Sequence, residues 1–204
     1  MRIFLIRHAP TRWNSDKRIQ GRTDIALSRQ ARVNLQNTTL PAPWLKIKWI
    51  SSPLQRAQQT AQLLGSNEYE IHSELTEMDW GQFEGLHLSE INRRIKVLGL
   101  SPDRGLDLLP PGGESPRMAR ERLSRWVQTQ LPTQSTLIAV THKGVIRAAL
   151  SLATGWDMQR PFEQEIDWSL PLAFESTDTG QFELIGVNCA WENTDILEPN
   201  SVSC

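Results

Sequence analysis

The 204-residue chain has little cysteine, almost no net charge and no long apolar run. Its two cysteines, Cys189 and Cys204, form neither a CxxC pair nor a cluster with histidines at zinc spacing, so we expect free thiols. Twenty-two basic and twenty-three acidic side chains give a formal charge of -1, which offers no overall attraction for nucleic acid or an anionic membrane. Any recognition of an anion must therefore be local.

The N-terminal segment 1–6 holds too few apolar residues for a signal-peptide core or a membrane span, so a cytoplasmic location without a membrane partner is expected. A composition of 39% hydrophobic and 22% charged residues is typical of a globular protein of this length. We predict a single domain over residues 1–192 and a loose tail over residues 193–204. The sequence leaves the oligomeric state open, a homodimer included.

Apolar runs alternate with helical patterns along most of the chain. Strands are predicted at residues 2–6, 46–50, 68–72 and 136–140, and helices at 28–36, 54–64, 88–98, 115–131 and 145–153. Residues 170–174 and 182–187 predict a terminal hairpin, and residues 101–113, rich in proline, glycine and aspartate, predict a loop. This order predicts an α/β fold, a three-layer α/β/α sandwich with a mixed, mostly parallel sheet.

Polar side chains follow three of the predicted strands. Arg7 and His8 follow the first, two serines at 51–52 follow the second, and His142 follows the strand at 136–140. Ligands of such sheets bind beyond the carboxyl ends of the strands, so we expect these side chains on one rim. Arginine is the preferred cation for phosphate oxygens, and a neutral imidazole can attack phosphorus. A lone histidine at a strand end more often caps or packs, but the joint pattern favours a phosphate site.

Five segments carry a more specific pattern, and they occur in a fixed order over about three quarters of the chain. They are residues 7–14 (R-H-A-P-T-R-W-N), 20–28 (Q-G-R-T-D-I-A-L-S), 51–61 (S-S-P-L-Q-R-A-Q-Q-T-A), 75–85 (L-T-E-M-D-W-G-Q-F-E-G) and 141–147 (T-H-K-G-V-I-R). In this order they resemble the motifs of the histidine phosphatase superfamily, also called phosphoglycerate-mutase-like, branch 1. One such motif would be weak evidence, but five in order are specific.

The resemblance implies a phosphoglycerate-mutase-like fold and a metal-independent reaction without a cofactor. His8 matches the residue that becomes phosphohistidine, and Arg7, Arg56 and His142 match the residues that hold the phosphoryl group. Glu77 matches the proton donor, which would protonate the leaving alkoxide and then activate water. Two guanidiniums and an imidazolium would stabilise the charge on the phosphoryl oxygens electrostatically.

Other matched positions line the expected phosphate pocket. Asn14 matches a phosphate-contacting position, and Gln20 and Gly21 match the pocket wall, where Gly21 is needed for backbone shape. The carboxylates of Asp79 and Glu84 lie close to Glu77 in sequence. Which carboxylate donates the proton, Glu77 or Asp79, is left open.

The chain departs from the family motifs at three positions. Ala9 and Pro10 replace the usual glycine and glutamate after His8, which predicts a stiffer loop. Lys143 replaces a glycine after His142; a side chain pointing to the surface is favoured over an added cation for an acidic substrate.

The expected partner is a small-molecule phosphate monoester. Residues 86–113 are short where the mutases of the family carry a longer basic insertion, and residues 110–115 (P-P-G-G-E-S) resemble a loop of the phosphatase members. Hydrolysis is therefore favoured over mutase activity. Within the phosphatases, α-ribazole 5'-phosphate is the leading candidate substrate, and a broad-specificity sugar-phosphate phosphatase is the alternative.

Two further hypotheses come from other classes. One is a non-catalytic module that binds phosphorylated ligands, which the intact catalytic set disfavours. The other is a zinc site that uses His8, His142 and a carboxylate. The neighbouring arginines disfavour a divalent cation, so no metal is expected.

Overall fold

The computed structural model describes residues 1–66, 68–97, 105–130, 136–177 and 181–197. The strands in these ranges are β1 (Arg2–Arg7), β2 (Lys48–Ser51), β3 (Glu70–Ile71), β4 (Thr136–Thr141), β5 (Leu172–Ser176) and β6 (Phe182–Gly186). The helices are α1 (Arg12–Ser15), α2 (Arg29–Gln36), α3 (Ala42–Leu45), α4 (Gln55–Leu63), α5 (Leu88–Val97), α6 (Pro116–Gln130) and α7 (Lys143–Thr154). Short 3-10 turns lie at Ser73–Leu75, Gly81–Phe83 and Asp195–Leu197.

The strands form one mixed sheet in the order β3-β2-β4-β1-β5-β6. The first four strands in this order run parallel, whereas β5 is antiparallel to β1 and β6 is antiparallel to β5. The predicted mostly parallel sheet with a late hairpin is therefore confirmed. In the register, Arg7 of β1 lies opposite Thr141 of β4, and Ser51 of β2 lies opposite Val140. The carboxyl ends of these three strands are thus level with one another.

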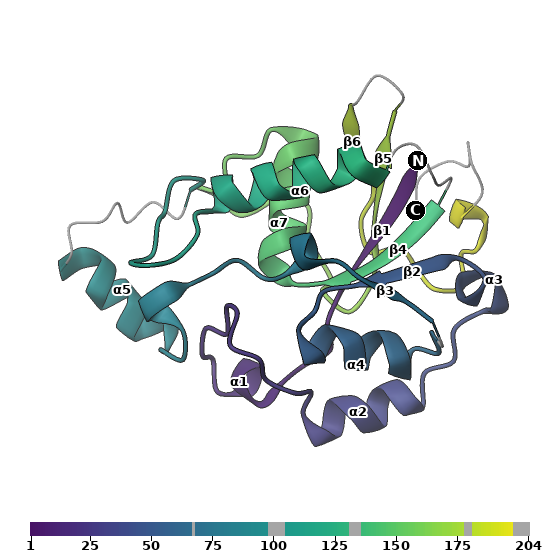
Figure 1. Cartoon of the computed structure of the whole chain (residues 1–204), viewed down its shortest axis with the longest axis horizontal. Coiled ribbons are helices and arrows are strands. Elements are labelled where there is room, and N and C mark those ends of the chain that lie inside the picture. Colours follow the sequence, from purple (N-terminus) through teal and green to yellow (C-terminus); the bar gives the residue numbers. More distant parts are fainter. Residues whose placement is uncertain (67, 98–104, 131–135, 178–180, 198–204) are drawn as a thin grey trace.

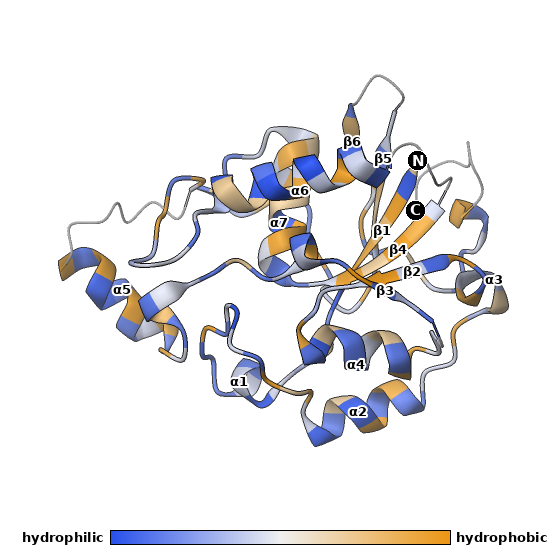
Figure 2. Cartoon of the chain, in the orientation of Figure 1, coloured by the Kyte–Doolittle hydropathy of each residue, from blue (hydrophilic) through white to orange (hydrophobic). Residues whose placement is uncertain are grey.

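Helices cover both faces of the sheet, which confirms the three-layer sandwich (Figure 1). One apolar core packs α6 and α7 against the sheet, with Leu123, Trp126 and Ile146 among its buried members. The second core packs α4 against the other face, where Ala57 and Ala61 are buried. Figure 2 shows the consequence in hydropathy: β1 and β4 are almost wholly apolar, while α2, α4 and α6 alternate apolar and hydrophilic residues.

Local signals set several of the element boundaries. Helix α2 begins at Arg29 because the Ser28 Oγ accepts a hydrogen bond from the Ala31 amide at 3.1 Å. Helix α7 ends at Thr154 and is capped by Gly155, which has a φ of 75°, a left-handed conformation that glycine adopts without strain. Helix α7 begins at Lys143, two residues earlier than predicted, so its first turn reaches the rim of the sheet.

Two short segments differ from the sequence prediction. Residues 42–45, for which no element was predicted, form the single turn α3, and its Trp44 is buried edge-on against Phe4 and Trp191. The predicted strand at 68–72 pairs only over Glu70 and Ile71. Both differences come from tertiary packing at the edge of the sheet, which overrides the local pattern.

The C-terminal region corrects two expectations. Ile196 and Leu197 are buried in the core, and the Ile196 carbonyl accepts a hydrogen bond from Arg2, so a loose tail beginning at residue 193 is wrong for 193–197. The expectation of a free thiol is wrong for Cys189, which is buried and disulfide-bonded. Predicted features at residues 98, 101–104, 131, 178–180 and 198–204, Cys204 included, lie outside the described residues.

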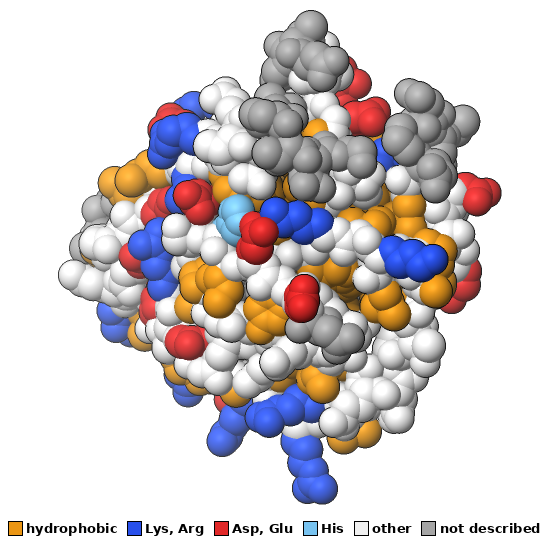
Figure 3. Space-filling view, turned by 45° about the vertical axis from the view of Figure 1, so that its right-hand side comes forward, with side chains coloured by type: hydrophobic (Ala, Val, Ile, Leu, Met, Phe, Trp, Pro, Cys, Tyr) orange, Lys and Arg blue, Asp and Glu red, His pale blue; other side chains and the backbone are white. Residues whose placement is uncertain are grey.

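The surface in Figure 3 shows basic and acidic side chains interspersed over the visible face, with apolar side chains between them. This distribution agrees with the near-zero formal charge of the chain. In the part of the chain that the structure describes, no helix combines the length and apolar character that a membrane span requires.

Candidate active site

The ends of β1, β2 and β4 bring the predicted rim residues together. Backbone pairing continues one residue beyond the strands: the His8 amide donates to the Thr141 carbonyl at 2.9 Å, and the Ser52 amide donates to Val140 at 2.9 Å. The imidazole rings of His8 and His142 consequently lie 5.1 Å apart between centroids. A rigid hydrogen-bonded ladder, and not a free loop, therefore sets the spacing of the two rings.

A cavity of about 310 Å³ opens at this rim. Seven of the eight predicted site residues line it: Arg7, His8, Asn14, Gln20, Gly21, Arg56 and Glu77. The eighth, His142, is fully buried beside His8 and Arg56 and is not part of the lining. The structure thus places residues from four separated segments around one space.

His8 is held in the protonation state that a nucleophile requires. Its Nδ1 lies 2.8 Å from the Ala9 carbonyl oxygen, and because a carbonyl only accepts, Nδ1 carries the proton. The lone pair therefore belongs to Nε2. Burial lowers the pKa of His8 well below its usual value of 6.5, and the positive charges of Arg56 and Arg7 lower it further. The ring is neutral at neutral pH.

Arg7 lies half-buried on the cavity wall, directly before His8. Among the described residues its Nε finds no hydrogen-bond partner, although the atom is buried. Buried donors of a guanidinium are costly to leave unpaired, so an unpartnered donor at a cavity wall fits an anion. Burial lowers the pKa of Arg7 below its usual value, and the negative charge of Glu77 opposes this shift.

Arg56 is fully buried in the first turn of α4, and its guanidinium organises the site. Its Nη1 donates to the Thr23 carbonyl at 2.8 Å and its Nη2 donates to the Gly21 carbonyl at 2.7 Å. Its Nε donates to His142 Nδ1 at 3.3 Å. Three of the five N–H groups are therefore used by the protein, and two are left for a ligand in the cavity.

His142 is neutral in this structure, and the imidazolium was expected only during phosphoryl transfer. Its Nδ1 accepts from Arg56, which only donates, and its Nε2 lies 2.7 Å from the Ser52 Oγ. Burial lowers the pKa of His142 well below 6.5, and the charge on Arg56 adds to this shift. The sequence motif at 51–52 had not assigned Ser52 a role; the structure shows that it orients His142.

Glu77 lines the cavity from a segment between two 3-10 turns. Its Oε1 accepts from the Met78 amide at 2.9 Å and its Oε2 accepts from the Gly144 amide at 3.2 Å. A side chain at position 144 would overlap Glu77 Oε1, so this approach needs glycine in the first turn of α7. Burial raises the pKa of Glu77 above its usual value of 4.5, which suits a proton donor.

The two competing carboxylates hold loops in place and do not line the cavity. Asp79 accepts from the Gly81 amide at 2.8 Å and lies 3.5 Å from the Arg22 guanidinium. Glu84 accepts from the backbone amides of Arg22 at 2.7 Å and Thr23 at 2.9 Å. The geometry therefore favours Glu77 as the carboxyl that can reach a bound substrate.

Asn14, Gln20 and Gly21 form the wall opposite the strands. The Asn14 Oδ1 accepts from the Thr11 backbone amide at 2.9 Å, which directs the acceptor side of the amide into the protein and leaves the NH₂ group as its donor side. Gln20 accepts from the Thr11 hydroxyl at 3.0 Å. Gly21 has a φ of 53°, and a Cβ there would overlap the Glu84 carboxylate.

Sequence reasoning missed several residues of the cavity. Two are cationic, Arg18 and Arg147, and Arg147 lies over the ring of Trp156. Lys143, which the sequence offered as a possible added cation, also lines the cavity and lies over the ring of Trp168. It is exposed, in keeping with the favoured surface orientation. The apolar part of the lining includes Ile19, Met78, Trp80, Leu88, Leu108, Pro116 and Met158. Arg147 is the last residue of the motif at 141–147, so the sequence could have suggested it. The apolar lining residues come from separate segments, and no local pattern predicts them.

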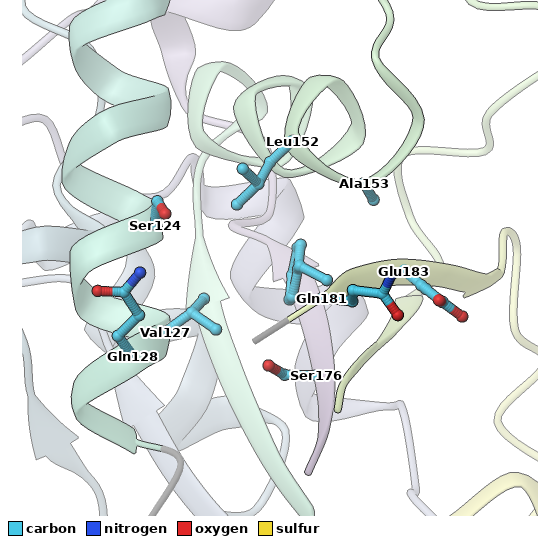
Figure 4. A pocket seen from close by; sticks show the side chains of 9 residues that line it. Ser124, Val127, Gln128, Leu152, Ala153, Ser176, Gln181 and Glu183 are labelled. Carbon is cyan, nitrogen blue, oxygen red and sulfur yellow. The ribbon is translucent and has the colours of Figure 1, made fainter. Parts of the chain in front are cut away.

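A second cavity, of about 410 Å³, lies between α6, α7 and the strands β5 and β6 (Figure 4). Ser124 and Val127 line it from α6, and Leu152 lines it from α7. None of the predicted site residues reaches it. Within the described residues, no three His, Cys, Asp or Glu side chains group as metal ligands.

Comparison with known proteins shows the family of this chain. The chain is 31% identical over 168 residues to the uncharacterized phosphatase PhoE of Bacillus subtilis, covering 76% of this chain and 78% of that protein. It is 24% identical over 211 residues to a 2,3-bisphosphoglycerate-dependent phosphoglycerate mutase of Gloeobacter violaceus, covering 97% and 94%. The structure of the α-ribazole phosphatase from Shigella flexneri superposes with a TM-score of 0.73 at 21% identity, covering 93% and 96%, which shows a shared fold. The family model of the histidine phosphatase superfamily (branch 1) matches residues 3–180, and the chain belongs to that family.

Proposed function

We propose that this protein is a metal-independent phosphatase that hydrolyses a phosphate monoester of a small metabolite through a phosphohistidine on His8. One observation carries the proposal: the Nδ1–H of His8 is bound to the Ala9 carbonyl, which leaves the Nε2 lone pair on a neutral ring at the cavity. Arg7, which is half-buried, and Arg56, which is fully buried, supply two guanidiniums beside it. Such an arrangement combines a nucleophile with preorganised charge stabilisation.

In the first step, the phosphate binds against Arg7 and the remaining donors of Arg56. The His8 Nε2 attacks phosphorus, an N–P bond forms, and the bond from phosphorus to the leaving oxygen breaks. The protonated Glu77 carboxyl gives its proton to that oxygen, so a neutral alcohol departs. His142, which is neutral before binding, regains a more normal pKa when a phosphate dianion lies nearby, because an opposite charge favours the imidazolium.

In the second step, the Glu77 carboxylate accepts a proton from a water molecule as its oxygen attacks phosphorus. The N–P bond breaks, inorganic phosphate is released, and His8 returns to the neutral Nδ1–H form. Glu77 ends the cycle protonated, as it began. The amides of Met78 and Gly144 hold its carboxylate throughout.

The leading candidate substrate is α-ribazole 5'-phosphate. The P-P-G-G-E-S segment at 110–115 and the short stretch at 86–113 support a phosphatase of this group. Trp80, Leu88, Leu108 and Met158 give the cavity an apolar part that suits a flat aromatic base attached to the sugar. A broad-specificity sugar-phosphate phosphatase is the alternative, and it requires no such apolar contact.

The test is a screen of α-ribazole 5'-phosphate, fructose bisphosphates, phosphoglycerates and nucleoside monophosphates, with and without a chelator. We expect phosphate release, unchanged by chelation, with α-ribazole 5'-phosphate preferred. Rapid quenching of a reaction with labelled substrate should trap an acid-labile phosphoenzyme. The His8→Ala variant should form no such phosphoenzyme, and its rate should be at least about a thousandfold lower. Trapping by His8→Ala, or tight binding of every monoester without turnover, would reject the proposal.

A further inference from the structure

Glu114, the glutamate of the P-P-G-G-E-S segment, is buried but does not line the cavity. It is 7% exposed, and its carboxylate points to the back of the segment that carries Glu77. The Glu114 amide donates to the Asp79 carbonyl at 2.8 Å, and the Asp79 amide lies 3.4 Å from Glu114 Oε2. A buried carboxylate needs partners, and the identity of these partners indicates what it does.

Two arginines from different parts of the chain meet at this carboxylate. Arg122 of α6 pairs with it through two hydrogen bonds, from Nε at 3.0 Å and from Nη2 at 2.9 Å. Arg22, from the loop that follows Gly21, lies 3.5 Å away through its Nη2. A bidentate guanidinium–carboxylate pair fixes orientation as well as distance. Glu114 therefore joins helix α6 to the loop that forms the cavity wall.

The same two arginines hold the segment of Glu77. Arg122 Nη1 donates to the Glu74 carbonyl, and Arg22 Nε lies 3.5 Å from the Glu77 carbonyl oxygen. Residues 76–80 have no helix or strand to define their backbone. The network around Glu114 supplies that definition, so the Glu77 carboxyl is held in place from behind.

We propose that Glu114 is a positioning residue that sets the Glu77 carboxyl at the leaving oxygen. This inference rests on the proposed function and deepens it, because it assigns the P-P-G-G-E-S glutamate to the proton-transfer half of the site. Arg7 and Arg56, which face the phosphate, make no contact with Glu114 among the described interactions. Loss of Glu114 should therefore impair protonation of the leaving group and spare phosphate binding.

The test compares two kinds of leaving group in the full-length enzyme. p-Nitrophenolate leaves without a proton, whereas an alkoxide needs one from Glu77. For Glu114→Gln we expect kcat/KM to fall about tenfold with the preferred alkyl monoester of the screen, through kcat and not KM, and to stay within about threefold with p-nitrophenyl phosphate. Glu114→Asp, which keeps the charge, should recover part of the loss.

Glu121→Gln is the matched control, because Glu121 is an exposed glutamate of α6 next to Arg122; it should leave both rates unchanged. Arg122→Lys is a second variant, which keeps the positive charge but cannot form the bidentate pair with Glu114. Its kcat/KM should fall for the alkyl monoester and not for p-nitrophenyl phosphate, by a smaller factor than in Glu114→Gln. It preserves the test if Glu114→Gln fails to fold.

Equal losses with both substrates, or no loss in either variant, would overturn the positioning role while the phosphatase activity of the wild-type enzyme still stood. A wild-type enzyme that releases no phosphate from any monoester would overturn the proposed function and this inference together.

Discussion

Under the proposed function, the cavity has a phosphate end, formed by Arg7, His8, Arg56 and His142, and a leaving-group end, formed by other lining residues. The two ends are built differently. At the phosphate end, strand β1 ends at Arg7 and is followed directly by His8, and the neighbouring hydrogen-bonded strand β4 is followed directly by His142. Arg56 lies in the first turn of the packed helix α4. At the leaving-group end, Arg18, Trp80, Leu88 and Leu108 come from loops or from the start of a helix. The residues to which we assign the chemistry therefore lie on rigid elements, and those we assign to the leaving group lie on segments that tolerate change.

The two ends also differ in charge environment. The phosphate end is buried enough to hold both histidines neutral, and two of the five Arg56 donors are used by protein carbonyls. The leaving-group end is partly open and mixes cations with apolar side chains. Substitutions at the first end should consequently alter the rate of reaction with every substrate, and those at the second end should alter the choice among substrates.

Arg56→Ala is expected to have the largest effect among these substitutions. It removes charge stabilisation of the phosphoryl group and also releases the Gly21 and Thr23 carbonyls and His142. Steady-state assays should show kcat/KM reduced about 10²- to 10³-fold with all monoesters. Arg29→Ala, at an exposed position on α2, is the control. A substrate-dependent loss would break the distinction between the two ends.

The pH profile of kcat/KM should show the opposite shifts of His8 and Glu77. Because the pKa of His8 is lowered, protonation stops the nucleophile only well below pH 6.5. Because burial raises the pKa of Glu77 above 4.5, the proton donor is lost at a higher pH than for an ordinary glutamate. Activity toward an alkyl monoester should rise through the first pKa and fall through the second. Glu77→Gln should be about a hundredfold slower and lack the falling limb.

A falling limb that persists in Glu77→Gln would assign the proton donor to another group, such as Asp79. The same profile measured with p-nitrophenyl phosphate provides the control, because kcat/KM reports only formation of the phosphoenzyme and this leaving group needs no proton.

Gly21→Ala tests the wall between the two ends. The φ of 53° and the overlap of a Cβ with Glu84 predict a loss of about 1–3 kcal/mol in the free energy of unfolding, measured with urea. We also expect activity to fall about tenfold, since a shift of the Gly21 carbonyl loosens Arg56. Gly155→Ala is a matched control with a φ of 75° and no atom within 4 Å of the added Cβ; it should lose stability only.

Lys143→Ala should have the smallest effect on rate. Lys143 lies at the cavity over the Trp168 ring, 4.6 Å from its centroid, and not at the phosphate clamp. With p-nitrophenyl phosphate we expect kcat/KM within about threefold of the wild-type value. The ranking of substrates in the screen should shift against those with a second anionic group. A large loss with every substrate would place Lys143 at the phosphate end.

Most of the fold could be predicted because its signals are local. The apolar run at β4 and the Ser28 cap of α2 each specify an element within a few residues. What failed depended on distant partners. Trp44 turns a proline-rich stretch into α3 by packing against Phe4 and Trp191, and Ile196 joins the core from beyond the expected end of the domain.

The candidate site shows the same division. Sequence motifs selected Arg7, His8, Arg56 and Glu77, and the structure gathers them at one cavity. The motifs gave no sign that Glu114, more than thirty positions away from Glu77, would reach the back of its segment. Hydrogen bonds between loops depend on three-dimensional placement, so no pattern of spacing reveals them.

The sequence by itself determined the family, the layered α/β fold and the residue types at the phosphate end, because strands and motif residues are encoded over short spans. The tertiary structure alone decided the protonation state of His8 and His142, since burial and the charge of Arg56 lower their pKa values. It also decided which carboxyl faces the cavity, because Asp79 and Glu84 accept hydrogen bonds from loop amides while Glu77 lines the cavity and accepts from the Gly144 amide.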